Sequence, residues 1–278
     1  MQKKPKKKIK KPVEKFDPYL LYLNSVQSPE HDAELLLKMW DKEIGRSRGP
    51  LVLQEDFCGT AALCYEWVQL NHEFQAVGID LEPSALKWGK DHFEDHLIED
   101  ATDRVKLVCG DVLIDHGIKP NIICALNFSY FFIKQRSVLL EYFKTAKNSL
   151  AGSKDGLLII DSFGGPEYLM PHEDRRRNSE MKFSYLWTID SFDAVKHHLQ
   201  CHISFQRDGE SLRKNVFNYD WRLWSVPELT DLLIEAGFKT VSYWAEGLTT
   251  KGYGDGKFKP IKTEKNCQAW VIYLIAKV

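Results

Sequence analysis

The sequence lacks any long hydrophobic run, and its cysteines do not occur in close pairs. The longest apolar runs, residues 122–126 and 270–276, are far too short to span a bilayer. The basic N-terminus is not followed by the apolar stretch of a signal peptide. Six cysteines lie singly, without a C-x-x-C pair, so we expect neither a disulfide framework nor a zinc site. These absences predict a soluble, cytoplasmic protein with no membrane partner.

Basic residues are concentrated at the N-terminus. Residues 1–11 contain seven lysines and no acid, whereas the 278-residue chain has a net charge of −1, so the remainder carries about −8. An acidic body of this kind is unsuited to binding a phosphate backbone. We interpret residues 1–15 as a disordered lysine-rich arm and expect any nucleic-acid binding to depend on it. The sequence indicates no oligomeric state.

Apolar segments of strand length alternate with helical segments from residue 51 onward. Strands are predicted at residues 51–54, 75–79, 105–109, 121–127 and 156–161, then at 240–244 and 268–276, the last two joined by a glycine- and lysine-rich loop. Helices are predicted at residues 60–70, from 83, at 137–150 and at 226–236. This alternation implies right-handed crossovers. The fold class is therefore α/β, with a doubly wound, mostly parallel, seven-stranded sheet.

The alternation is interrupted between residues 164 and 222. Around Asp208-Gly209, a hairpin signal, apolar residues alternate with His198, Gln200 and His202. We expect residues 164–222 to form an inserted antiparallel β cap that binds the acceptor. Residues 16–44 look helical, and residues 16–45 are expected to act as an N-terminal helical lid. Residues 46–163 and 223–278 would then form one Rossmann-type domain.

Acidic side chains follow the predicted strands. Ligands of an open parallel sheet bind beyond the carboxyl ends of its strands. Asp80, after the second strand, can accept both hydroxyls of a ribose, and Asp111, after the third, can accept from an adenine amine. An acid closing the first strand can meet an ammonium group. Gly59, in the turn that follows, allows close backbone approach to a ligand.

Three of these strand ends resemble the motifs of class I S-adenosylmethionine-dependent methyltransferases. Residues 55–61 (EDFCGTA) resemble the first motif, residues 77–80 (VGID) the second, and residues 110–112 (GDV) the third. Residues 224–238 are similar to the helix and turn before the family's final hairpin. The resemblance extends from about residue 50 to the C-terminus. It implies a Rossmann-type methyltransferase fold with S-adenosyl-L-methionine as cofactor.

The resemblance also implies a set of cofactor-binding residues. Glu55, rather than Asp56, aligns with the motif's acid, although Asp56 could share its role. Phe57 and Ala61 depart from the pattern, because both positions are usually glycine. The implied cofactor contacts are Glu55, Asp56, Phe57, Cys58, Gly59, Asp80, Leu81, Asp111, Val112 and Asn127.

The predicted activity is methyl transfer to a small-molecule acceptor. Candidate acceptor contacts are Tyr19, Tyr22, Tyr185, His198 and His202, with Trp187 and Tyr219 suited to covering a planar molecule. A general base is optional in this reaction, and the positions to inspect for one are Asp161 and His172.

Four other interpretations are possible; the sequence disfavours two of them and leaves two open. The histidines near residue 200 have metal-like spacing, but the alternation places them on a strand, so no metal is expected. A nicotinamide-dependent oxidoreductase lacks support because G-x-G-x-x-G is absent. A nucleic-acid or protein methyltransferase tethered by the lysine arm stays open. So does a non-catalytic S-adenosylmethionine-binding protein, because of Phe57 and Ala61.

Overall fold

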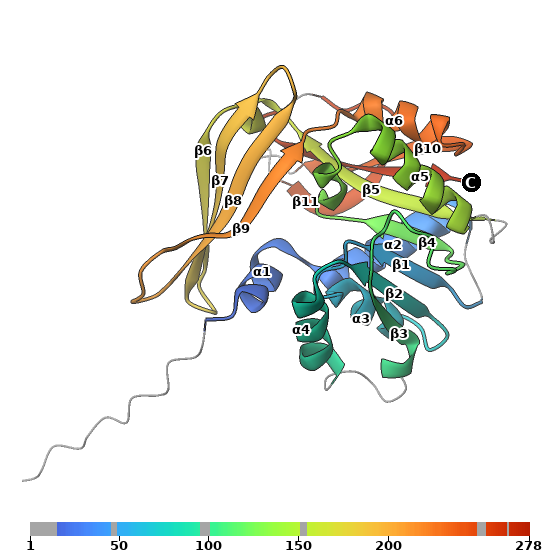
Figure 1. The fold of residues 1–278 in the computed structure, drawn as a ribbon, viewed down its shortest axis with the longest axis horizontal. Helices are drawn as coiled ribbons and strands as arrows, with labels where there is room; N and C mark the ends of the chain where they lie inside the picture. Colours follow the sequence, from blue (N-terminus) through green and yellow to red (C-terminus); the bar gives the residue numbers. More distant parts are fainter. Residues whose placement is uncertain (1–15, 46–48, 95–100, 151–154, 249–253, 266) are drawn as a thin grey trace, which may run out of the picture.

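A mixed eight-stranded sheet forms the centre of the computed structural model (Figure 1), which describes residues 16–45, 49–94, 101–150, 155–248, 254–265 and 267–278. The predicted lysine-rich arm lies outside these residues. The strands of this sheet are β1 (Val52–Asp56), β2 (Gln75–Asp80), β3 (Val105–Cys109), β4 (Ile122–Ala125), β5 (Leu157–Gly164), β10 (Thr240–Leu248), β11 (Gly254–Ile261) and β12 (Trp270–Lys277). Their spatial order is β11-β10-β12-β5-β4-β1-β2-β3. Strands β1 to β5 pair in parallel, and β12, β10 and β11 complete the sheet in antiparallel pairs.

Helices cover both faces of this sheet. The helices are α1 (Pro18–Val26), α2 (Pro29–Glu43), α3 (Ala62–Gln69), α4 (Pro83–Phe93), α5 (Arg136–Leu150) and α6 (Val226–Glu235). One hydrophobic cluster joins α2 and α3 to Leu157 and Ile159 of β5, and another joins α5 and α6 to Leu158 and Ile160. A strand buried on both faces reads as a continuous apolar run, which is why β5 was predictable. Among the described residues, no helix is long and apolar enough to cross a membrane.

A separate four-stranded antiparallel sheet follows β5. Its strands, in spatial as well as chain order, are β6 (His172–Asn178), β7 (Phe183–Asp193), β8 (His198–Arg207) and β9 (Arg213–Arg222). It stands beside the main sheet, with α1 below it in Figure 1. The predicted fold class, including the inserted antiparallel cap, is confirmed. The most polar cap strand, β6, carries too little apolar alternation to have been predicted from sequence.

Two details of the fold differ from the predictions. The main sheet has eight strands rather than seven, because the glycine- and lysine-rich segment forms edge strand β11 against β10. Lysines and a proline are typical of edge strands, whose outer side needs no partner, so local composition alone suggested a loop. The single helix expected at residues 16–44 is two helices. It breaks at Gln27 and restarts with Pro29, which has no N–H to continue α1.

Candidate active site

The turn after β1 has the positive φ angles typical of glycine at two positions, 57 and 61, that carry other residues. Phe57, Gly59 and Ala61 have φ angles of 58°, 55° and 56°. Phe57 and Ala61 therefore adopt the left-handed conformation that glycine would take at their positions, at a cost of about 1–2 kcal/mol each. The two residues that depart from the family pattern therefore have a backbone conformation that glycine favours.

Two glycines elsewhere make room for this turn. A Cβ atom at Gly78 of β2 would lie 2.8 Å from Cys58 Sγ, and one at Gly89 of α4 would lie 1.9 Å from the carbonyl oxygen of Thr60. Any side chain at either glycine would displace the turn. The glycine within the VGID segment therefore serves packing, and the acid that ends the segment is free for another role.

Asp80 ties the end of β2 to the β1 turn. Its Oδ2 accepts a hydrogen bond from the Gly59 N–H at 2.7 Å, and its Oδ1 accepts one from the Glu82 N–H at 2.8 Å. The carboxylate is half-buried and lines a cavity above the strand ends. Each oxygen retains a lone pair that can accept a hydroxyl.

Glu55 and Asp56 are both buried but have different surroundings. Glu55 lines the same cavity as Asp80, and its hydrogen-bond partner is the Cys64 thiol, which donates to Oε2 at 3.2 Å. Burial raises the pKa of Glu55 to about 8. Asp56 accepts hydrogen bonds from Gln54 Nε2 (2.8 Å) and the Tyr142 hydroxyl (2.9 Å) and does not line the cavity. Glu55 is therefore the acid available to a ligand, and Asp56 anchors the turn to α5.

The cavity over the strand ends, which we name the strand-end cavity, has a volume of about 240 Å³. The predicted cofactor residues that line it are Glu55, Phe57, Cys58, Gly59, Asp80 and Asn127. Tyr19 and Tyr22 of α1 also line it. The structure thus brings together residues from the ends of β1, β2 and β4 and from the N-terminal helix.

The other predicted cofactor residues lie away from this lining. Leu81 is 69% exposed, Val112 is buried in the core cluster of α5, and Asp56 lies below the turn. Asp111 is half-buried, and its Oδ1 accepts from the Leu113 N–H at 3.0 Å, so it caps its own loop. Sequence reasoning found the acidic residues at the strand ends, but only the direction and contacts of each side chain separate those that line the cavity from those that support it.

Helix α1 is held against both sheets. Asp17 caps the helix through Oδ1 and accepts from the Trp88 indole N–H of α4 through Oδ2 at 2.8 Å. On the other side, Leu21 packs with Ile203 and Phe205 of the cap. These contacts place α1 between α4 and the cap sheet, over the strand-end cavity.

A second cavity of about 140 Å³, which we name the cap cavity, adjoins the first. Tyr22, Asn127 and Tyr219 line both cavities, so the two meet at these residues. Eight of the twelve residues lining the cap cavity are aromatic. Among them are the predicted acceptor residues Tyr22 and Tyr185, with Trp187 and Tyr219. Sequence reasoning missed Phe128, Phe163 and Trp221, although Trp221 lies two residues after Tyr219 and therefore on the same face of β9.

His198 and His202 do not line either cavity. Side chains of a strand alternate between its faces, and the face of β8 that meets α1 and the cap cavity carries Ile203 and Phe205 instead. His202 lies on the other face, where its Nδ1 is 2.8 Å from Asp190 Oδ2. The expectation that the polar cap face meets the acceptor is therefore corrected. The apolar face lines the cavity, because it is the face that packs against the rest of the protein.

Neither candidate general base, Asp161 or His172, lines the strand-end cavity or the cap cavity. Asp161 is buried, and its two oxygens accept the backbone N–H groups of Asn127 and Phe128, both at 2.9 Å. It holds the turn after β4, in which both residues have positive φ angles. His172 begins β6, where its Nε2 lies 3.3 Å from Glu167 Oε1. These contacts make Asp161 a support for the cavity wall, and His172 lies outside the lining of both cavities.

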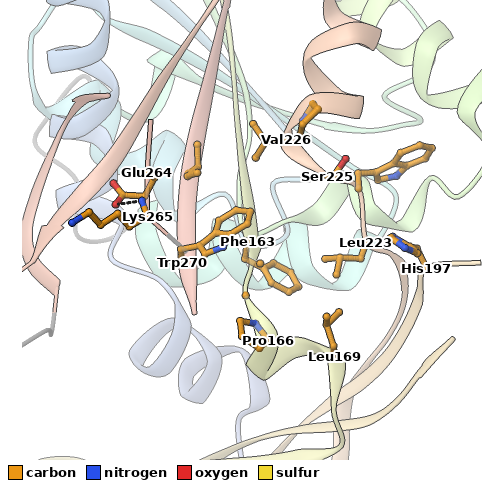
Figure 2. A pocket seen from close by; sticks show the side chains of 15 residues that line it. Phe163, Pro166, Leu169, His197, Leu223, Ser225, Val226, Glu264, Lys265 and Trp270 are labelled. Atoms are coloured by element: carbon orange, nitrogen blue, oxygen red, sulfur yellow. Dashed lines mark hydrogen bonds between the residues drawn. The ribbon is translucent and has the colours of Figure 1, made fainter. Parts of the chain in front are cut away.

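A larger cavity, of about 580 Å³, adjoins the cap cavity at Phe163, which lines both (Figure 2). Its wall is mainly apolar, with Trp270 and Phe163 at the centre of Figure 2 and Leu169 and Leu223 around them. None of the residues predicted to bind cofactor or acceptor lines it. Size alone does not identify a site. The two smaller cavities carry the converging polar groups, so they form the candidate active site.

Solved structures share this arrangement of sheet and cap. No protein-family model and no curated protein matches the sequence. An S-adenosylmethionine-dependent methyltransferase from Clostridium acetobutylicum is 18% identical, with a TM-score of 0.62 over 93% of this chain and 96% of that chain. The CcbJ methyltransferase from Streptomyces caelestis is 15% identical, with a TM-score of 0.64 over 89% and 95%.

A third similar structure is an amino pentose methyltransferase from Micromonospora echinaspora. It is 15% identical, with a TM-score of 0.64 over 94% of this chain and 97% of that chain. At these identities the likeness concerns the fold. The fold is that of the class I S-adenosylmethionine-dependent methyltransferases, as the strand-end motifs predicted.

Proposed function

We propose that this protein is an S-adenosylmethionine-dependent methyltransferase that acts on a small-molecule acceptor. One observation carries the proposal: a carboxylate-lined cavity at the strand ends opens onto an aromatic cavity at Tyr22, Asn127 and Tyr219. A methyl donor and its acceptor need adjoining compartments, since the reaction requires donor carbon, nucleophile and leaving group to lie in line.

The residues of the strand-end cavity fit the cofactor. Glu55 is a buried carboxyl group whose hydrogen-bond partner is a thiol, so a cation is favourable beside it. The ammonium of a methionine moiety supplies such a charge. Asp80 presents lone pairs suited to ribose hydroxyls, and the Gly59 turn allows close backbone approach. When bound, the cofactor supplies an activated methyl group on a sulfonium, which leaves as a neutral thioether.

The protein's own residues bind and orient the cofactor and the acceptor, and they exclude water from both cavities. Asp161 holds Asn127 and Phe128 in their turn, which fixes the wall between the two cavities. Tyr19 and Tyr22 of α1 cover the strand-end cavity, and the cap sheet covers the other. Excluding water and fixing the acceptor are sufficient for a reaction whose leaving group is already good.

A small-molecule acceptor is favoured over a macromolecule. The cap cavity has a volume of about 140 Å³ and is bordered by α1 and the cap, which leaves room for a small planar or apolar group. The likeness to an amino pentose methyltransferase supports the same class of acceptor. A nucleic-acid or protein acceptor would have to be recruited by the lysine arm, and a purely regulatory protein would not need the cap cavity.

Calorimetry with S-adenosylhomocysteine and transfer of a labelled methyl group test the proposal. We expect binding at a single site, weakened by substitution of Asp80, and label transfer to members of a panel of small amines, phenols and thiols. Binding without any product over that panel would favour the non-catalytic alternative. Absence of binding by the folded protein would overturn the proposal.

A further inference from the structure

The cap cavity is walled by aromatic faces that surround one small space. The Tyr219 and Trp221 ring centroids lie 4.6 Å apart, and Trp187 lies 5.8 Å from Tyr219 and 6.0 Å from Trp221. Phe163 completes the wall from the end of β5 at 6.0 Å from Trp221. Aromatic faces carry negative electrostatic potential and attract cations, most strongly where water is excluded.

No lining residue of the cap cavity is a carboxylate or a histidine. Burial raises the pKa of Tyr22 to about 12 and also raises the pKa values of Tyr185 and Tyr219. These hydroxyls therefore stay protonated near neutral pH. An acceptor in this cavity must bring a nucleophile that has a free electron pair without help from a base.

We propose that the cap cavity binds the acceptor as a neutral amine, which becomes an ammonium ion among the aromatic faces as it is methylated. The inference rests on the proposed function. The amine lone pair forms the new bond to the methyl carbon, the bond from that carbon to sulfur breaks, and its electron pair stays on sulfur. The positive charge thus moves from the sulfonium to the nitrogen, and a primary or secondary amine then releases a proton to solvent.

The aromatic wall favours the transition state over the ground state in this reaction. The amine is neutral while the sulfonium is charged, so the wall gains attraction only as charge reaches the nitrogen. A thiolate, phenolate or carboxylate acceptor would instead lose its charge on methylation and gain nothing from aromatic faces. The wall therefore suits an amine better than an anionic nucleophile.

One charged residue lines the cavity, and an ion pair offsets its charge. Arg176 is the one lining residue with a positive charge, and its Nε donates to Asp174 Oδ2 at 2.7 Å. Behind the wall, the Asp161 carboxylate is held by the turn between the cavities. Burial raises the pKa of Asp161 to about 7, so this group is only partly ionised near neutral pH and brings no positive charge to the cavity wall.

Trp221, a residue of the aromatic wall, has a buried donor without a partner, as Trp40 and Trp67 have elsewhere in the described residues. It is 3% exposed and lines the cavity, and its indole N–H has no hydrogen-bond partner among the described residues. A buried donor without an acceptor is costly unless a ligand satisfies it. We therefore expect the amine to belong to a molecule that also carries a hydrogen-bond-accepting oxygen or nitrogen.

The test compares choline with its neutral isostere 3,3-dimethylbutan-1-ol by calorimetry, on the protein saturated with S-adenosylhomocysteine. The two probes have the same shape and a hydroxyl oxygen but differ in charge. We expect choline to bind at least about tenfold more tightly than the alcohol.

Substitutions at Trp187 test the aromatic wall itself. Trp187→Leu should abolish the preference for choline, and Trp187→Phe should retain most of it. Phe192→Leu is the matched control, because Phe192 lies on the same strand but lines neither cavity.

The outcomes separate this inference from the proposed function. Equal affinity for the two probes, a preference for the alcohol or for 3,3-dimethylbutanoate, or no binding of any probe would overturn the amine acceptor while S-adenosylhomocysteine still binds. A choline preference without S-adenosylhomocysteine binding would instead overturn the proposed function, and the amine acceptor with it. A preference lost equally in Phe192→Leu and Trp187→Leu would also count against the aromatic wall.

Discussion

The backbone N–H of Gly59 donates a 2.7 Å hydrogen bond to Oδ2 of Asp80, which joins the turn after β1 to the end of β2. These two segments are neighbours in the sheet but lie 21 residues apart in the chain. Asp80 thus holds the turn in place while facing the strand-end cavity. A change at Asp80 should affect both the cofactor site and the turn, which calls for two different substitutions.

Asp80→Ala is expected to weaken S-adenosylhomocysteine binding by about 1.5–3 kcal/mol, the scale of hydrogen bonds to a charged group. Asp80→Asn retains an oxygen for the Gly59 N–H and should weaken binding less, with a smaller loss of thermal stability. Calorimetry and thermal unfolding of both variants check this. Unchanged affinity in a folded Asp80→Ala protein would remove Asp80 from the cofactor site.

Cofactor affinity should rise with pH through the titration of Glu55. Burial raises the pKa of Glu55 to about 8 in the free protein, so its carboxyl is mostly protonated near neutral pH. An ammonium beside it favours the carboxylate and lowers its pKa in the complex, so binding releases a proton and affinity falls as pH decreases below about 8.

Calorimetry between about pH 6 and pH 7.5 should show S-adenosylhomocysteine affinity changing by up to about tenfold per pH unit. Glu55→Gln, which cannot ionise, should bind more weakly and with little pH dependence. An identical pH dependence in this variant would mean that another group supplies the linked proton.

Ala61 provides a test of the turn's unusual backbone. Ala61→Gly should change the free energy of unfolding by no more than about 1 kcal/mol, because relief of the left-handed conformation offsets the lost buried methyl group. Ala61→Val should destabilise by about 2 kcal/mol or more, since a β-branched residue is strained at a φ angle of 56°. Urea unfolding measures both. Equal stability of the two variants would show that the turn does not need this conformation.

Releasing α1 should speed cofactor dissociation. Trp88→Phe removes the indole N–H that donates to Asp17, while a ring stays beside Tyr19, 5.8 Å away in the wild type. We expect S-adenosylhomocysteine to dissociate up to about tenfold faster in stopped-flow fluorescence. Lys87→Ala on the same helix removes only an exposed ion pair with Asp91 and serves as the control. Equal rates in both variants would argue that α1 does not cover the site during release.

The lysine arm should be dispensable for stability and cofactor binding. Deletion of residues 1–11 removes seven lysines and three apolar residues, Met1, Pro5 and Ile9. We expect an unchanged melting temperature and unchanged S-adenosylhomocysteine affinity. Any salt-dependent RNA or DNA binding, measured by fluorescence anisotropy, should disappear with the arm. Strong nucleic-acid binding by the truncated protein would favour a macromolecular acceptor.

The sequence by itself determined the parallel sheet and the acidic residues at its strand ends. The apolar run of β5 and the polar residues that close β1 and β2 are local patterns, and Glu55, Gly59 and Asp80 follow from them. A strand's end and the residue type there are set within a few residues of chain. Such features can be predicted without knowledge of the partners.

Only the tertiary structure decided which side chains meet across the two cavities. Tyr22 of α1 and Tyr219 of β9 line both cavities, yet nearly two hundred residues separate them in the chain. The same holds for Asp17 with Trp88 and for the choice of the apolar cap face over the face of His202. A strand's alternation indicates that it has two faces but not which element each will meet. That choice depends on how α1, the cap and the main sheet pack together, and packing is a property of the whole chain.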